Sequence, residues 1–229
     1  MKIDGGIFVG RNPRTGTDLP LESLKDWMEK SSTTGALFCS YRALYDDMYA
    51  GNEETLGIAK SHKGLAPLAV INHLHFDTST DYLARLKKMG AKGFLFAPSL
   101  QYGSTKPVNF RLGVQRAAKI GLPLQIAIAS PEEFSDAFEA TKGTQVPVLI
   151  RTLGGGAYKL MTDFIAAARE RKNLYFDVGS IVPNGGIAYL AKVIGLQRLY
   201  FSSNAPANIE RSTHLLIEAA PDLTEKEKK

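Results

Sequence analysis

Short, nearly continuous apolar segments alternate with longer segments of mixed polarity along the whole chain. The apolar segments have the length and the β-branched or aromatic content of strands. Because they carry few polar positions, they are typical of parallel strands that helices cover on the outside. They span residues 2–10, 34–40, 65–72, 91–98, 122–129, 146–152, 173–179 and 197–203.

The intervening segments have apolar residues at three- and four-residue spacing, which indicates amphipathic helices. Pro20 and the segment 130–133 (Ser-Pro-Glu-Glu) are helix start signals, whereas Gly90, Gly121 and Gly195 stand where helices commonly end. The predicted helices cover residues 20–31, 51–62, 79–89, 108–120, 131–141, 157–171, 184–194 and 206–219.

This alternation predicts an α/β protein with a single (β/α)8 TIM barrel over residues 1–222, followed by a charged tail at 223–229. A doubly wound open sheet is the rival architecture. It is disfavoured because "GGIFVGRNPRTG" after the first strand is not a GxGxxG fingerprint, and no Walker-type lysine motif is present. The same observation gives no reason to expect a nucleotide cofactor, and we predict no cofactor.

Composition narrows the class of protein further. The chain has 229 residues, 44% hydrophobic and 22% charged, with a formal net charge of +5. No run of Lys and Arg interleaved with aromatic residues is present, which argues against nucleic-acid binding. No apolar segment approaches the ~20 residues of a membrane span, and the N-terminus lacks the apolar region of a signal peptide. We therefore expect a cytoplasmic protein, with Cys39 as its one cysteine.

In a TIM barrel the functional residues lie at the carboxyl ends of the strands. The first, second, sixth and seventh predicted strands end at or near Arg11, Arg42, Arg151 and Asp177. An arginine at a barrel mouth needs a carboxylate partner or an anionic ligand. Two interpretations stay open: an ion pair of Arg151 with Asp177 or Asp4, or a clamp for a substrate carboxylate. Tyr41, Gln101, Tyr102 and Thr152 are further candidates for substrate binding.

"NHLHFD" at residues 72–77 has the HxH spacing that often holds a metal, because alternate residues of a strand point the same way. No other His or Cys is placed to complete the set, since His62 and His214 fall in predicted helices. His73 is then a candidate proton carrier, because imidazole titrates near neutral pH. A nucleophilic pair of Cys39 with His73, and an anion cradle at glycines 154–156, are weaker alternatives to simple burial and to tight turn packing.

The chain resembles the amidohydrolase superfamily, in particular its compact amidohydrolase-2 branch with decarboxylases and lactonases. "IDGGIFVG" resembles the family's first strand, Ile-Asp-x-His-x-His-x-Gly. Further similarities run in order through "GAKGFLFAPSLQYG", "GLPLQIAI", "PVLIRTLGGG", "NLYFDVGS" and "RLYFSSNAP". The resemblance covers nearly the whole chain and implies a metal-dependent barrel hydrolase.

The resemblance also assigns positions to the family's metal ligands. The first-strand histidines fall on Gly6 and Phe8, the fifth- and sixth-strand histidines on Ala127 and Thr152, and the eighth-strand aspartate on Asn204. None of these side chains is a strong ligand for a transition metal. We therefore expect no metal.

The function expected is that of a metal-free, lactonase-like hydrolase of a small carboxylate-bearing metabolite. His73, Asp177 and Asn204 are its predicted catalytic residues, and Arg11 and Arg151 would hold the anion. The alternative is a catalytically inactive homologue that binds a small anion or a partner protein. By analogy with the family, the protein is expected to form a homodimer.

Overall fold

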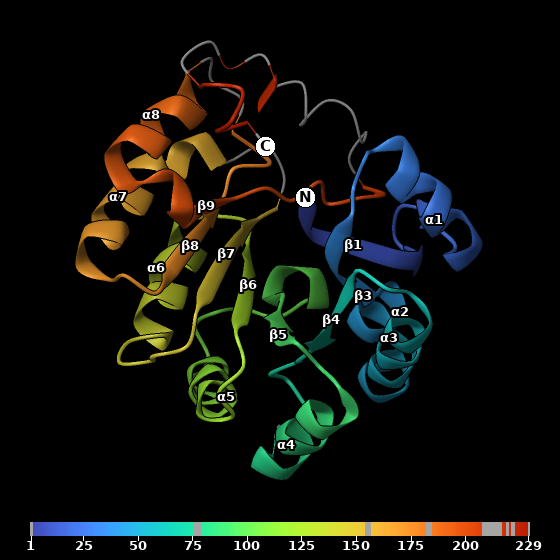
Figure 1. Ribbon diagram of the computed structural model, residues 1–229. Coiled ribbons are helices and arrows are strands. Elements are labelled where there is room, and N and C mark those ends of the chain that lie inside the picture. Colours follow the sequence, from blue (N-terminus) through green and yellow to red (C-terminus); the bar gives the residue numbers. More distant parts are fainter. Residues whose placement is uncertain are drawn as a thin grey trace.

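One curled sheet, with helices packed around its outer face, makes up the computed structural model of this chain (Figure 1). The structure describes residues 2–75, 79–153, 157–181, 185–207, 217–218, 220 and 223–228, except the side chains at 157 and 158. The strand order is β2-β1-β3-β4-β5-β6-β7-β8-β9, parallel throughout except for the antiparallel pair of β1 and β2. The strands are β1 (Ile3–Arg11), β2 (Asp18–Leu19), β3 (Gly35–Ser40), β4 (Leu65–Val70), β5 (Gly93–Phe96), β6 (Leu124–Ile128), β7 (Val148–Thr152), β8 (Leu174–Asp177) and β9 (Leu199–Tyr200).

The helices follow the strands in alternation, as the apolar spacing predicts. They are α1 (Leu21–Lys30), α2 (Tyr41–Tyr45), α3 (Met48–Ser61), α4 (Thr80–Met89), α5 (Val108–Lys119), α6 (Pro131–Ala140), α7 (Met161–Glu170) and α8 (Gly186–Ile194). Short 3-10 turns lie at η1 (Pro98–Gln101), η2 (Ala157–Leu160) and η3 (Leu196–Arg198). No helix in the described part of the chain is long and apolar enough to cross a membrane.

Local sequence signals fix several helix ends. The Ser130 side chain accepts a hydrogen bond from the Glu133 amide at the start of α6, with Pro131 at the first helical position. Gly90 ends α4 in the left-handed conformation at φ 114°, which a residue with a side chain rarely adopts. Both predicted signals are thus confirmed.

The two faces of the sheet carry separate cores because side chains alternate along each strand. Along β4, Ala69 packs outward with the helices, whereas Leu68 and Val70 pack inward with Phe8 and Ala127. The inner core is small and includes aromatic residues of the mouth. The curled sheet therefore brings inward-pointing residues of distant strands close together.

The structure contains one strand and one α-helix that the sequence pattern does not predict. The hairpin partner β2 is two residues long, and α2 is a helix of five residues directly after β3. Neither is long enough to show a periodic pattern, so the sequence predicts neither of them. The predicted helix at 206–219 falls mostly outside the described residues; of the four that are described, 206 and 207 are not helical and 217 and 218 are.

Strand pairing does not run around a closed ring. The ladder ends at β9, whose neighbour is β8 alone in the described sheet. Two backbone hydrogen bonds nevertheless join β1 to the segment after β9: the Gly5 amide donates to Phe201 O (2.6 Å) and the Phe8 amide to Ala205 O (2.8 Å). The expectation of a TIM barrel is confirmed in its coarser form, as a curled α/β sheet in an incomplete barrel.

Candidate functional site

The guanidinium of Arg151 lies at the centre of a buried polar network. Arg151 is in β7 and is 1% exposed. Its Nε donates to Asn204 Oδ1 (2.7 Å) and its Nη2 to the Gly6 carbonyl (2.9 Å), while Nη1 reaches Gln125 Oε1 at 3.4 Å. The guanidinium carbon also stands 4.2 Å from the centre of the Phe8 ring. One side chain therefore links β1, β6, β7 and the segment after β9.

Among the residues that the structure describes, no carboxylate lies within ion-pair distance of Arg151. In the described residues the ion pairs are Arg42 with Asp46 and Lys228 with Glu225. The ion pair with Asp177 or Asp4 that the sequence left open is thus not formed within 4.0 Å. A buried cation without a counter-ion is costly, and here carbonyl and amide oxygens and an aromatic face offset the lost hydration.

Asp177 at the end of β8 is the second buried charge-bearing group. Its Oδ2 accepts hydrogen bonds from Ser202 Oγ (2.5 Å) and from the amide and hydroxyl of Thr152 (both 3.3 Å). Its Oδ1 accepts from the amides of Gly179 and Ser202 (2.8 and 3.1 Å). Burial nevertheless raises the pKa of Asp177 to about 6, against the lowering effect of these donors and of Arg151. The carboxyl therefore titrates close to neutral pH.

Asn204 connects the two groups. It is held in the left-handed region at φ 56°, which Asn tolerates better than most residues. Besides accepting from Arg151, it donates from Nδ2 to the Thr152 carbonyl (3.3 Å). Arg151, Asn204, Thr152 and Asp177, all predicted site residues, are thus brought together. Their assigned roles stay predictions.

Asp4, in β1, is a further carboxyl group beside this network. Its Oδ1 accepts from the amides of Gly6 (2.9 Å) and Ser203 (3.1 Å), so it also joins β1 to the segment after β9. Its Oδ2 is buried and has no hydrogen-bond partner among the described residues. Burial raises the pKa of Asp4, with Ser203, Gly6 and Arg151 acting in the opposite direction.

A column of aromatic rings leads from this centre to the surface. The Phe8 ring stacks on Tyr41 (centroids 5.0 Å apart), and Tyr41 stacks on Tyr45 (5.8 Å). Arg14, from the loop between β1 and β2, then lies 4.5 Å from the Tyr45 ring and 3.6 Å from the Tyr102 ring. Tyr102 is 83% exposed. These side chains fill the mouth between β1, β3 and β5.

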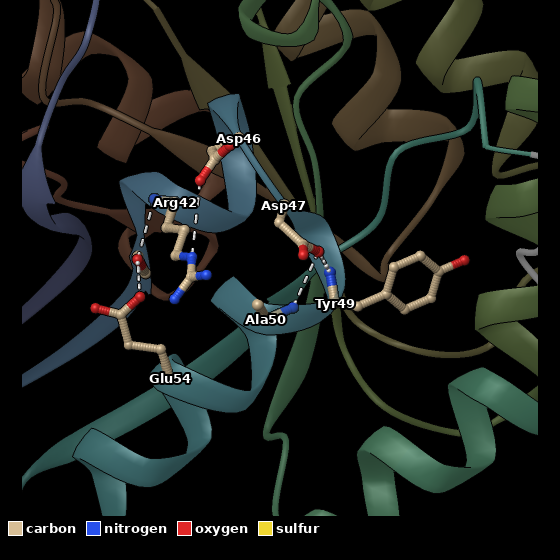
Figure 2. A network of polar contacts seen from close by, with 7 residues as sticks. Arg42, Asp46, Asp47, Tyr49, Ala50 and Glu54 are labelled. Atoms are coloured by element: carbon tan, nitrogen blue, oxygen red, sulfur yellow. Dashed lines mark hydrogen bonds and ion pairs between the residues drawn. The ribbon is translucent and has the colours of Figure 1, made fainter.

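The other predicted arginines lie away from the centre. Arg11 is exposed at the end of β1. Arg42 begins α2 with its side chain 52% exposed and pairs with Asp46 at 3.8 Å, in the surface network of Figure 2. In the same view Asp47 Oδ1 caps α3 by accepting from the amides of Tyr49 and Ala50. Gln101, predicted as a pocket wall, is buried, and neither atom of its amide has a hydrogen-bond partner.

His73 lies on the outer face of the sheet. Its ring packs edge-on against Phe110 of α5 (5.5 Å), and a side chain on Gly103 would come within 2.7 Å of it. Burial lowers the pKa of His73, which favours the neutral imidazole. The described contacts of His73 include no member of the Arg151 network. His75, two residues on, is exposed and meets the edge of Tyr49.

The remaining candidates are structural or lie outside the described residues. Cys39 is buried in the inner core, where burial raises the pKa of its thiol to about 12, so a thiolate is disfavoured. Asp77, His214 and the glycines at 154–156 lie outside the described residues. The described part of the chain contains no group of three His, Cys, Asp or Glu side chains that could hold a metal ion.

Sequence reasoning missed Gln125 and Arg14 as members of the site, whereas Ser202 is among the residues at the end of the last predicted strand, 197–203. Gln125 had a visible signal, because it is the one polar residue inside the apolar segment 122–129. Its amide donates to the Gly5 carbonyl (2.7 Å) and accepts from Arg151. Arg14 had no comparable signal, since arginine is an ordinary loop residue.

The sequence itself places this site in a family. The profile of the amidohydrolase family matches residues 41–229, which is most of the chain. The chain belongs to the amidohydrolase family. No curated protein matches its sequence significantly.

Solved structures of amidohydrolases share the fold at low sequence identity. A probable 2-pyrone-4,6-dicarboxylic acid hydrolase from Acinetobacter baumannii with citric acid bound has a TM-score of 0.70 and 12% identity, over 99% of this chain and 94% of that one. A 2,6-dihydroxybenzoate decarboxylase from Rhizobium has a TM-score of 0.75 and 10% identity, over 99% and 94%. An amidohydrolase from Burkholderia multivorans with bound zinc has a TM-score of 0.70 and 12% identity, over 100% and 94%. These likenesses establish the fold of this amidohydrolase and leave its reaction open.

Proposed function

We propose that this amidohydrolase is a metal-independent hydrolase of a small carboxylate-bearing metabolite, such as a lactone, in a complete (β/α)8 barrel. One observation carries the proposal: a buried guanidinium that pairs with no carboxylate of the described residues lies in one network with a carboxyl group whose pKa is about 6. Fixed positive charge and a group that exchanges protons near neutral pH are what ester hydrolysis requires.

Each group has a role in this proposal. Above pH 6 the Asp177 carboxylate would take a proton from an attacking water and return it to the leaving oxygen. The Arg151 guanidinium would stabilise the negative charge that develops on the substrate. Asn204 and Thr152 would hold the two charged groups in place through the hydrogen bonds described above. His73 has no described contact with these groups, so we assign proton transfer to Asp177.

The substrate class follows from the charges at the mouth. Arg11 and Arg42 are exposed cations and the exposed Tyr102 offers a hydroxyl group, whereas Tyr41 and Gln101 are buried and could contact a substrate only after a rearrangement. A substrate carboxylate would bind to the arginines while its ester carbonyl faces the centre. Two of the similar structures are a probable hydrolase and a decarboxylase of carboxylates, which agrees with such a substrate.

A second candidate is a catalytically inactive homologue that binds a small anion or a partner protein. Two observations favour it. Asp177 and Arg151 are almost fully buried, and the Asp177 oxygens already accept bonds from the protein. The column from Phe8 to Tyr102 also fills the mouth, so a substrate must displace Arg14 or approach from another side.

A turnover assay separates the two candidates. Purified protein is tested with a panel of small lactones and carboxylate esters, with and without a chelator, and alongside Asp177→Asn. We expect hydrolysis that the chelator leaves unchanged and that Asp177→Asn lowers by at least about 100-fold, the usual contribution of a general base. Asp26→Asn makes the same change on the exposed face of α1 and should leave the rate as it is. Hydrolysis that the chelator abolishes, or no hydrolysis of any compound, contradicts the proposal.

A further inference from the structure

Five positions from different parts of the chain converge on one side chain. They are the positions that the family resemblance assigns to metal ligands: Gly6, Phe8, Ala127, Thr152 and Asn204. In the structure, the side chain they surround is Arg151.

Three of the five contact the guanidinium directly. The Gly6 carbonyl accepts from Nη2 (2.9 Å), Asn204 Oδ1 accepts from Nε (2.7 Å), and the Phe8 ring lies 4.2 Å from the guanidinium carbon. Two oxygens that face this space therefore already accept hydrogen bonds from a cation.

The other two positions adjoin Arg151 in the sheet. Ala127 is its partner in the register of β6 and β7, and Thr152 follows it in the chain. Ala127 is completely buried and contributes only a methyl group. The long arginine side chain can therefore extend along the inner face of the sheet toward β1.

Gly6 shows how completely the guanidinium fills this space. A Cβ atom on Gly6 would lie 2.4 Å from Arg151 Cζ and 2.5 Å from its Nη1, closer than real Cβ atoms approach other atoms. The φ of Gly6 is outside the left-handed region, so its backbone conformation does not demand glycine. Arg151 occupies the volume that a side chain at position 6 would take, so a larger residue there requires the hydrogen-bonded guanidinium to move.

We propose that the Arg151 guanidinium is the resident cation of this centre and takes the place of the metal ion that metal-bound relatives carry. A divalent ion there would meet a fixed positive charge at short range, in a buried site where charge repulsion is strong. It would also find the Gly6 and Asn204 oxygens engaged by Arg151 and no imidazole or thiolate among the five residues. The inference deepens the proposed function, on which it rests for the claim of metal independence, by naming the group that supplies the positive charge.

A double-mutant cycle in thermal unfolding tests the shared volume. Gly6→Ala in the wild-type protein should lower the Tm by about 5 °C or more, because the new methyl group collides with the guanidinium. In an Arg151→Ala background the same change should lower the Tm by less than about 2 °C, since the space is free. Gly57→Ala is the matched control: its Cβ would meet nothing within 4 Å in α3, so the Tm should stay the same or rise.

If Arg151→Ala does not fold, Arg151→Met serves as the background, because it removes the planar guanidinium and keeps an apolar side chain of similar length. Equal losses from Gly6→Ala in both backgrounds would overturn the inference.

Metal content is the second readout: wild-type protein incubated with Zn²⁺ or Mn²⁺ and then dialysed should retain less than a tenth of an equivalent. Retention of a full equivalent would overturn it as well. Neither measurement needs turnover. A protein that hydrolyses nothing can therefore still show both expected results, so a failure of the proposed function can be told from a failure of this inference.

Discussion

Asp177 shows how burial and hydrogen bonding compete at a single residue. Five hydrogen bonds from Ser202, Thr152 and Gly179 favour its charged form, yet the loss of hydration dominates and raises its pKa to about 6. The folded protein therefore holds the Asp177 proton more tightly than the unfolded chain, in which the value is near 3.8. This difference links protonation of one carboxyl to the free energy of unfolding.

The pH dependence of stability should reveal this link. Between pH 4 and pH 6 the folded state binds more protons at Asp177 than the unfolded state, so this residue's contribution to stability falls as pH rises through that window. The loss is complete above pH 6 and amounts to about 3 kcal/mol for a pKa that rises from 3.8 to about 6. In Asp177→Asn this part of the slope disappears, and the part that Asp4 adds in the same direction remains.

The measurement is urea unfolding of both proteins from pH 4 to pH 8. Relative to Asp177→Asn, the wild type should lose stability as pH rises to 6 and then run parallel to it. Asp26→Asn, on the exposed face of α1, controls for the removal of one carboxylate from the protein. Curves for wild type and Asp177→Asn that are parallel over the whole range would show that burial does not shift this carboxyl.

The sequence identified the two charged groups at the centre of the site and could not identify their surroundings. Arg151 and Asp177 were visible because each is a charged residue at the end of an apolar strand. His73 also follows an apolar strand, β4. It lies two residues after Ile71 and four after Ala69, so its side chain is on the same face of the sheet as theirs, and those residues pack against the helices. The face on which a residue lies depends on where the strand begins its alternation, and β4 is apolar on both faces. Its sequence alone therefore does not tell the inner face from the outer one.

At the scale of elements, long periodic segments were predictable and short ones were not. The strands from β3 to β8 and the helices from α3 to α8 were all expected, with ends that shift by a few residues. α2 escaped because tertiary packing, with Tyr41 buried between Phe8 and Tyr45, stabilises a helix of only five residues. β2 is a strand because it pairs with β1, and a sequence of two residues is too short to predict that pairing.

The attachment of α3 to β4 depends on one buried amide that also escaped prediction. Asn52 is completely buried; its Oδ1 accepts from the Val70 amide (2.7 Å) and its Nδ2 donates to the Val70 carbonyl (2.9 Å). The Asn52 side chain thus makes the two hydrogen bonds, to the amide and the carbonyl of Val70, that a neighbouring strand would otherwise make. A second bond from Nδ2 reaches the Tyr82 hydroxyl of α4 (3.1 Å).

Asn52→Ala should destabilise the protein by about 2–4 kcal/mol, because it leaves a buried amide and a buried carbonyl without partners. Chemical denaturation at pH 7 measures the loss. Glu53→Ala, the next residue of α3 and exposed, should change the free energy of unfolding by no more than about 0.5 kcal/mol. A loss below 1 kcal/mol for Asn52→Ala would mean that water satisfies the Val70 backbone when the amide is removed.

At the scale of the whole molecule, the way in which the sheet closes was the part least open to prediction. The alternating pattern predicts eight units and says nothing about how the first meets the last. In the structure they meet through two backbone bonds, the Asp4 carboxylate and the Arg151 bridge between Gly6 and Asn204. None of these contacts follows from periodicity, because they join residues far apart in the chain, from 53 positions for Arg151 and Asn204 to 199 for Asp4 and Ser203. Side chains of the candidate site therefore also hold the two ends of the sheet together.

If this is so, weakening the Arg151 bridge should open the seam between β1 and the segment after β9 before it affects the rest of the sheet. Arg151→Lys keeps the charge and loses the fork that reaches Gly6 and Asn204 at once. The amides of Gly5 and Phe8, which bond to Phe201 O and Ala205 O across the seam, should then exchange hydrogen at least tenfold faster, equivalent to about 1.4 kcal/mol of local opening. The amides of Phe94 and Leu124, bonded to Pro123 O and Pro147 O within the parallel sheet, should exchange as in the wild type.

Residue-resolved exchange compares the four amides in one sample, with Arg42→Lys as the same change at an exposed arginine. Equal acceleration of all four would mean that Arg151 stabilises the sheet as a whole, and unchanged exchange at Gly5 and Phe8 would mean that the backbone bonds close the seam without it.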